Sequence, residues 1–80
     1  MDIFYYNIPK WHREDEWLPV EALDFSSAAE NACMERDESY DYEIVSTGGL
    51  KEILVKDSDE VIKRFEIEAY AEPVYEAYEL

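Results

Sequence analysis

The strongest constraint on the fold is a strict alternation of apolar and polar residues close to the C-terminus. Over residues 65–72, alternate positions are apolar or small, and the positions between them are glutamate or tyrosine; the two sets are Phe65, Ile67, Ala69 and Ala71, and Glu66, Glu68, Tyr70 and Glu72. A period of two is that of a β-strand with one buried face. We therefore predict a long strand here, with its glutamates facing solvent.

A helix starting at Ser58 is the competing interpretation of residues 58–72. Helical spacing is also satisfied by four apolar residues of this stretch, Val61, Ile62, Phe65 and Ala69. The strand is favoured because the alternation persists for eight residues.

Other segments also have strand-like patterns. We predict strands over residues 2–8, 17–24, 40–46, 50–56 and 74–80. Pro19 places the second of these at a sheet edge or a bulge, because proline cannot donate to the strand ladder. Gly48-Gly49 predicts the turn of a hairpin that joins strands 40–46 and 50–56.

One helix is predicted after Phe25. Ser26 or Ser27 can cap its N-terminus, and Glu30 stands three residues after Ser27, as in a capping box. Helical spacing relates Ala29, Ala32, Cys33 and Arg36. The elements together predict an α+β fold, with one α-helix packed on a mostly antiparallel β-sheet of about four to six strands, in a single domain spanning residues 1–80.

The chain is strongly acidic, with 21 acidic and 7 basic residues and a net charge of −14. The charge is uneven: it is −6 over residues 24–43, zero over residues 44–65 and −5 over residues 66–80. Such a chain should be repelled by DNA, RNA and anionic membranes, so a basic partner is expected. A single cysteine, the lack of a secretory signal and the lack of a long apolar run predict a cytoplasmic protein.

The chain lacks the residue patterns of common catalytic and metal sites. His12 is interpreted as a solvated or stacked loop residue, and Cys33 as a core residue on the alanine-rich helix face. No cysteine or histidine pair has the spacing of a zinc site. A calcium loop starting at Asp57 fails because Val61 and Ile62 occupy its fifth and sixth positions. We expect a protein that is not an enzyme and that has no cofactor and no bound metal.

The pattern that remains is a set of carboxylates interleaved with tyrosines. Alternate residues of a strand lie about 6.6 Å apart on one face, whereas a B-DNA strand presents a phosphate every ~3.4 Å of axis. Acidic rows of this kind can imitate phosphates, although the solvated face of any antiparallel sheet looks similar. The predicted partner-binding residues are Asp37, Glu38, Asp41, Glu43, Glu66, Glu68, Tyr70, Glu72, Tyr75, Glu76 and Tyr78, with Glu14, Asp15 and Glu16 as a looser third patch.

The chain resembles small, acidic, phage-encoded anti-CRISPR proteins that inhibit type I surveillance complexes. The resemblance lies in residues 20–30, Val-Glu-Ala-Leu-Asp-Phe-Ser-Ser-Ala-Ala-Glu, where a strand runs into an alanine-rich helix, and in the later hairpin and acidic end. It implies a non-catalytic inhibitor, in the cytoplasm of a bacterial host cell, that occupies the DNA-binding surface of a CRISPR effector subunit and blocks DNA recruitment. It also implies direct contact with protein and not with nucleic acid or membrane.

A second function is compatible with the same residues. The chain is alternatively a small interaction or structural module that pairs through its C-terminal edge strand, residues 74–80, with its charge serving only solubility. A monomer or a small homo-oligomer is expected in either case.

Overall fold

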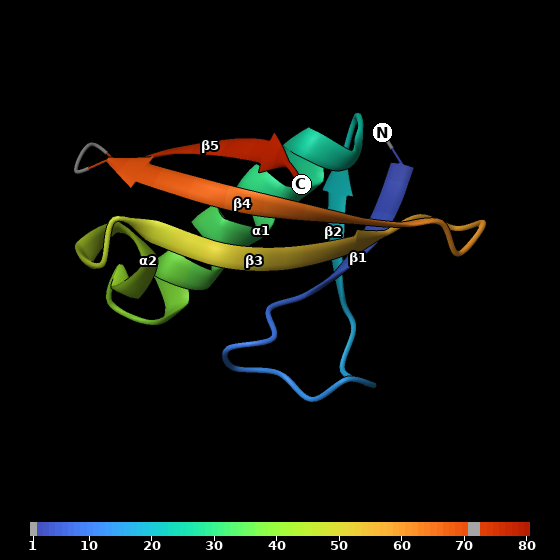
Figure 1. The fold of residues 1–80 in the computed structure, drawn as a ribbon, viewed down its shortest axis with the longest axis horizontal. Helices are drawn as coiled ribbons and strands as arrows, with labels where there is room; N and C mark the ends of the chain where they lie inside the picture. The colour runs from blue at the N-terminus through green and yellow to red at the C-terminus, as the bar shows by residue number, and fades with distance from the viewer. Residues whose placement is uncertain (1, 71–72) are drawn as a thin grey trace.

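The computed structural model describes residues 2–70 and 73–80 and confirms the α+β fold. Its elements are the strands β1 (Asp2–Asn7), β2 (Leu18–Ala22), β3 (Gly49–Lys56), β4 (Ile62–Tyr70) and β5 (Val74–Glu79), and the helices α1 (Phe25–Ser39) and α2 (Glu43–Ser46). All paired strands are antiparallel, in the order β2-β1-β3-β4-β5 (Figure 1). Both helices contribute to one core on one face of the sheet, and we call the opposite side the open face.

The long strand predicted over residues 65–72 is confirmed as β4 as far as Tyr70, and the competing helix is wrong over residues 58–70; residues 71 and 72 lie outside the described residues. Phe65, Ile67 and Ala69 are buried against the helices, whereas Glu66 and Glu68 are exposed on the open face. Residues 57–60 form a turn because the Asp57 carboxylate accepts hydrogen bonds from the backbone N–H groups of residues 59 and 61, both at 2.9 Å. That geometry returns the chain as a hairpin and does not start a helix.

The predicted strand over residues 40–46 is wrong, and so is its hairpin with residues 50–56. Asp41 and Tyr42 adopt the left-handed conformation, with φ of 58° and 57°, and the short helix α2 follows them. β3 pairs instead with β1 and β4. Gly49 is required at the start of β3, because a Cβ atom there would overlap the backbone carbonyl of Ile67.

The capping of α1 also differs from the expectation. Asp24, and not a serine, is the N-cap, and its carboxylate accepts a hydrogen bond from the Ser27 N–H at 2.8 Å. Glu30 takes no part in a capping box. Its carboxylate instead accepts a hydrogen bond from the Ala77 N–H of β5 at 3.0 Å.

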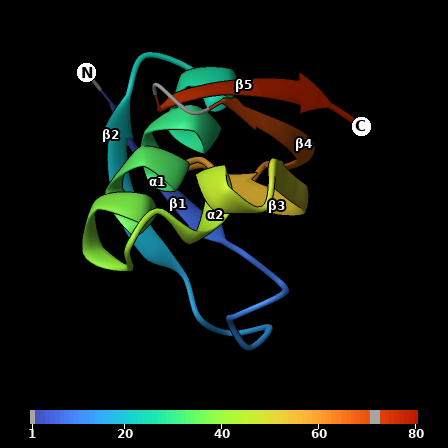
Figure 2. The same cartoon turned by 90° about the vertical axis from the view of Figure 1, so that its left-hand side faces the viewer.

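The sheet curls around α1 (Figure 2). Two adjacent residues of α1 form hydrogen bonds with its two edge strands. Glu30 bonds β5, and the Asn31 amide donates to the Glu21 carbonyl of β2 at 3.1 Å. The edge positions that the sequence predicted for Pro19 and for residues 74–80 are both confirmed.

Small side chains let α1 lie close to the sheet. Ala28, Ala29, Ala32 and Cys33 are completely buried among the inward residues of all five strands. Cys33 is therefore a core residue, as predicted. In the part of the chain that the structure describes, neither helix has the length and apolar character needed to cross a lipid bilayer.

We predict that the Cys33 thiol is inert in the folded protein. Burial raises the pKa of the Cys33 thiol, so both access and thiolate formation are suppressed. Iodoacetamide should modify Cys33 at least about a hundredfold more slowly in buffer than in urea, and Cys33→Ala should cost about 1 kcal/mol of unfolding free energy. Rapid alkylation without urea would contradict the core assignment.

Candidate functional site

Five of the predicted contact residues meet on the open face. Glu66, Glu68 and Tyr70 extend along β4, and Glu76 and Tyr78 lie on β5. The register pairs Glu66 with Tyr78, and Glu68 with Glu76, directly across the two strands. All five side chains are exposed. We call these five residues the C-terminal acidic face.

Each tyrosine of this face bonds a glutamate on its own strand. The Tyr70 hydroxyl donates to Glu68 at 2.9 Å, and the Tyr78 hydroxyl donates to Glu76 at 2.6 Å. These hydrogen bonds raise the pKa of Tyr70 and raise the pKa of Tyr78 to about 12. Both phenols are therefore neutral donors at physiological pH, and they orient the carboxylates beside them.

The carboxylates of the C-terminal acidic face form no ion pair with the described part of the chain. Across residues 2–70 and 73–80, no lysine or arginine lies within ion-pair distance of Glu66, Glu68 or Glu76. Like charges directly opposite each other on neighbouring strands destabilise a sheet, and Glu68 and Glu76 are such a pair. The arrangement leaves negative charge available to an external cation.

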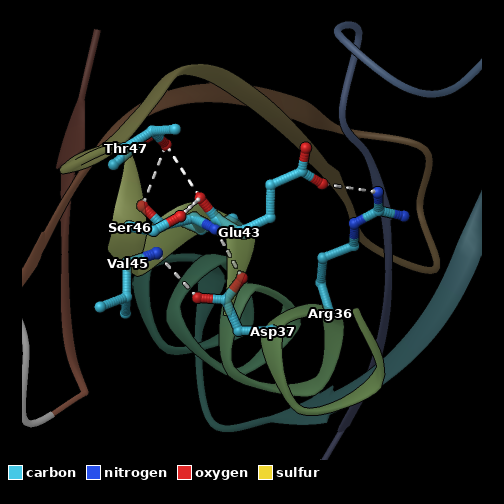
Figure 3. A network of polar contacts seen from close by, with 8 residues as sticks. Arg36, Asp37, Glu43, Val45, Ser46 and Thr47 are labelled. Carbon is cyan, nitrogen blue, oxygen red and sulfur yellow. Dashed lines mark hydrogen bonds and ion pairs between the residues drawn. The ribbon is translucent and has the colours of Figure 1, made fainter. Parts of the chain in front are cut away.

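Asp37 does not belong to any contact surface, contrary to the prediction. It is completely buried, and its carboxylate accepts hydrogen bonds from the N–H groups of Ile44 at 2.7 Å and Val45 at 2.9 Å, at the start of α2 (Figure 3). A third donor is the Tyr75 hydroxyl of β5, at 2.6 Å. A buried carboxylate needs such donors to offset its desolvation.

Tyr75 is likewise removed from the predicted contact residues, because it is buried beneath β5. Burial and the hydrogen bond to Asp37 raise the pKa of Tyr75, so its hydroxyl stays a donor. Sequence reasoning counted Asp37 and Tyr75 as surface groups because residue type reports charge and polarity, and not burial.

The remaining acids of the α1 end lie in the helical layer and not on the open face. Glu38 and Asp41 are exposed, whereas Glu43 is half-buried and pairs with Arg36 at 3.6 Å (Figure 3). The guanidinium of Arg36 also lies over the rings of Trp11 and Tyr40, at 4.1 and 3.9 Å from their centroids. These acids form a separate patch from the C-terminal acidic face.

The acidic patch at residues 14–16 lies in the loop between β1 and β2, and its three side chains, Glu14, Asp15 and Glu16, are exposed. Asn7 anchors this loop, because its side-chain amide donates hydrogen bonds to the carbonyls of residues 13 and 16. The patch is separate from the C-terminal acidic face. Glu72, the other predicted contact residue, lies outside the described residues.

The structure assigns His12 a role in shaping this loop. Its Nδ1 atom accepts a hydrogen bond from the Ile8 N–H at 3.0 Å. Burial lowers the pKa of His12, which keeps the imidazole neutral and able to accept. Within the described ranges, no three histidine, cysteine or acidic side chains are grouped so that they could hold a metal ion.

Sequence reasoning missed that the neutral segment folds beside the acidic one. Glu52 and Arg64, an ion pair at 2.6 Å, lie on the open face next to the C-terminal acidic face. A groove of about 700 Å³ opens there between the 9–10 and 47–52 segments and residues 66–68. Dividing the charge by sequence segment could not reveal this, because β3 and β4 are hydrogen-bonded neighbours.

Comparison of the chain with protein-family models, with curated protein sequences and with solved structures found no match.

We predict that the Asp37 network is a main source of stability. Tyr75→Phe removes a donor to a buried charge and should cost about 1.5–3 kcal/mol of unfolding free energy. Asp37→Asn places an amide N–H₂ group against backbone N–H donors and should cost about 3 kcal/mol or more. Urea unfolding followed by circular dichroism measures both.

The matched control is Glu38→Gln, the same type of change at the next, exposed position, which should stay within about 0.5 kcal/mol. Equal effects of Asp37→Asn and Glu38→Gln would contradict the buried network.

Proposed function

We propose that the protein is a non-catalytic inhibitor that binds a basic protein surface and thereby excludes nucleic acid from it. The observation that carries this proposal is the cross-strand pair of Glu68 and Glu76, which places two carboxylates opposite each other without a counter-ion among the described residues. A repulsive pair on an exposed face opposes folding but favours a cationic partner.

The spacing of the carboxylates supports imitation of a nucleic acid. Glu66 and Glu68 are two residues apart on one face of β4, a separation of about 6.6 Å. This corresponds to about two phosphate steps along the axis of one DNA strand. Glu76 adds a charge on β5 about 5 Å to the side, so the face presents a two-dimensional array of charge and not a single row.

The tyrosines suit the same role. Tyr70 and Tyr78 are each nearly half exposed, and their rings border the carboxylates that their hydroxyls bond. Aromatic side chains supply apolar contact area at interfaces, and their faces attract guanidinium and ammonium groups.

The partner we propose is a DNA-binding subunit of a type I CRISPR surveillance complex in a bacterial host cell. This identification is supported by the resemblance of the strand–helix segment over residues 20–30 to anti-CRISPR proteins and by the acidic, α+β character of the chain. Binding would block DNA recruitment without any chemical step.

The alternative function, pairing through the C-terminal edge strand, is less well supported. β5 is an edge strand, which such pairing needs. Its Ala77 N–H, however, is already bonded by the Glu30 carboxylate of α1. An added strand would have to displace this carboxylate, so the edge is protected against pairing.

The test measures binding to purified type I surveillance complexes and competition with their target DNA. The variant combines Glu66→Gln, Glu68→Gln and Glu76→Gln. A matched control makes the same change of three charges elsewhere, at Glu14→Gln, Asp15→Asn and Glu35→Gln. We expect the first to weaken binding at least about tenfold and the control to weaken it less than about twofold, because local charge determines the contact.

Salt titration and a competition assay complete this test. Binding of the unsubstituted protein should weaken steeply with salt, and the slope should be smaller for the first variant. Equal effects of the two variants would mean that only total charge matters. Simultaneous binding of the protein and DNA to one complex would contradict competition.

A further inference from the structure

The open face has a second, apolar end that the acidic residues do not explain. Ile3, Tyr5 and Ile62 point away from the core and are 51%, 37% and 51% exposed. The register places Tyr5 between Pro19 on β2 and Lys56 on β3, and Lys56 beside Ile62 on β4. We call Ile3, Tyr5, Pro19 and Ile62 the apolar end.

Exposed apolar side chains at these positions are unusual, with Ile3, Tyr5 and Pro19 as neighbours and Ile62 on the other side of Lys56. The solvated face of an antiparallel sheet normally carries polar side chains, because the other face supplies the core. In this protein both helices pack on that other face, around residues such as Ala29 and Ile44 (Figures 1 and 2). Clustered exposed apolar side chains typically mark an interaction site.

A groove beside the apolar end has room for a side chain of a partner protein. Its volume is about 580 Å³, and it is lined by Tyr5, Trp17, Lys56 and the turn over residues 57–60. The Lys56 ammonium lies 4.4 Å from the centroid of the Trp17 ring, which forms the apolar wall. Asp59 and Glu60 of that turn are exposed, and we call them the acidic rim of the groove; together with the Trp17 ring they favour an apolar group from a basic surface.

The negative charge of the chain indicates which kind of partner binds the open face. A second copy carries the same net charge of −14 and would be repelled. A basic protein surface is attracted both by the C-terminal acidic face and by the acidic rim of the groove. Ile62 and Glu68 are six residues apart on β4, a distance of about 20 Å, so one partner surface of ordinary size spans both ends.

We propose that one basic partner docks across the whole open face, with cations on the C-terminal acidic face and apolar side chains on the apolar end. This rests on the proposed function in requiring a basic partner, and it adds the requirement for apolar residues on that partner. The acidic face accelerates the encounter, and the apolar end slows dissociation.

Two synthetic peptides of about twelve residues test the proposal without the natural partner. Both carry a net charge of about +6 in a single basic run; one contains otherwise only serine and glycine, and the other has two leucines about 20 Å from the basic run when extended. Calorimetry at ~0.15 M salt should show the leucine peptide binding at least about tenfold more tightly. Amide NMR shifts of the unsubstituted protein should include Tyr5 and Ile62 only with that peptide.

Variants separate the two ends. Tyr5→Ser with Ile62→Ser should abolish the advantage of the leucine peptide and leave the basic peptide unchanged. Glu66→Gln with Glu68→Gln should weaken both peptides. Leu23→Ser, at an exposed apolar residue of the β2–α1 link, is the control and should leave both affinities within about twofold.

Three results would overturn the proposal: equal affinity for the two peptides, an advantage that survives Tyr5→Ser with Ile62→Ser, or a dimer in analytical ultracentrifugation that these substitutions dissociate. The last would assign the face to a second copy. Because the probes are peptides, failure of every surveillance complex to bind would contradict the proposed function and leave this result intact.

Discussion

The buried carboxylate of Asp37 is the interaction on which the arrangement of the C-terminal half depends. Its carboxylate accepts hydrogen bonds from the N–H groups of Ile44 and Val45 in α2 and from the Tyr75 hydroxyl. Its backbone carbonyl accepts hydrogen bonds from the N–H groups of Tyr40 and Tyr42. Asp37 thus bonds the backbone at the end of α1 and at the start of α2, and it connects β5 to both helices through Tyr75. The left-handed residues at 41 and 42 cost about 1–3 kcal/mol each, and these hydrogen bonds offset that cost.

The anchoring of β5 has a direct consequence for the surface. With Tyr75 held inward by Asp37 and the Ala77 N–H bonded to Glu30, the alternation of β5 directs Glu76 and Tyr78 outward beside β4. The repulsive pair of Glu68 and Glu76 is therefore imposed by contacts on the opposite face of the sheet. Stability is concentrated on the helical side, and the open face carries residues that folding alone does not require.

The sequence predicted those elements whose pattern is local. The alternation over residues 65–72 identified β4, and small residues at helical spacing identified the buried face of α1 around Cys33. The prediction failed over residues 40–46. The alternation of Tyr40, Tyr42 and Ile44 resembles that of a strand, but the Asp37 carboxylate bonds the backbone at the start of α2 and stabilises a helical turn there.

The candidate site was predicted in part for a related reason. Glu66, Glu68 and Glu76 were found because exposed strand positions follow from alternation. Asp37 and Tyr75 were misassigned because they bond each other across 38 residues of chain, and a local sequence pattern does not report such a contact. The apolar end was missed because Ile3 and Tyr5 lie on β1 and Ile62 lies on β4, on either side of β3, and the sequence does not reveal this strand order.

The central claim is that the repulsive pair of Glu68 and Glu76 serves binding, because a cationic partner contacts both carboxylates. The most direct measurement is the thermal midpoint and the partner affinity of Glu68→Lys, which converts the repulsive pair into an attractive one across β4 and β5. The claim predicts a higher midpoint together with a loss of binding of at least about tenfold. A lower midpoint, or undiminished binding, would contradict it.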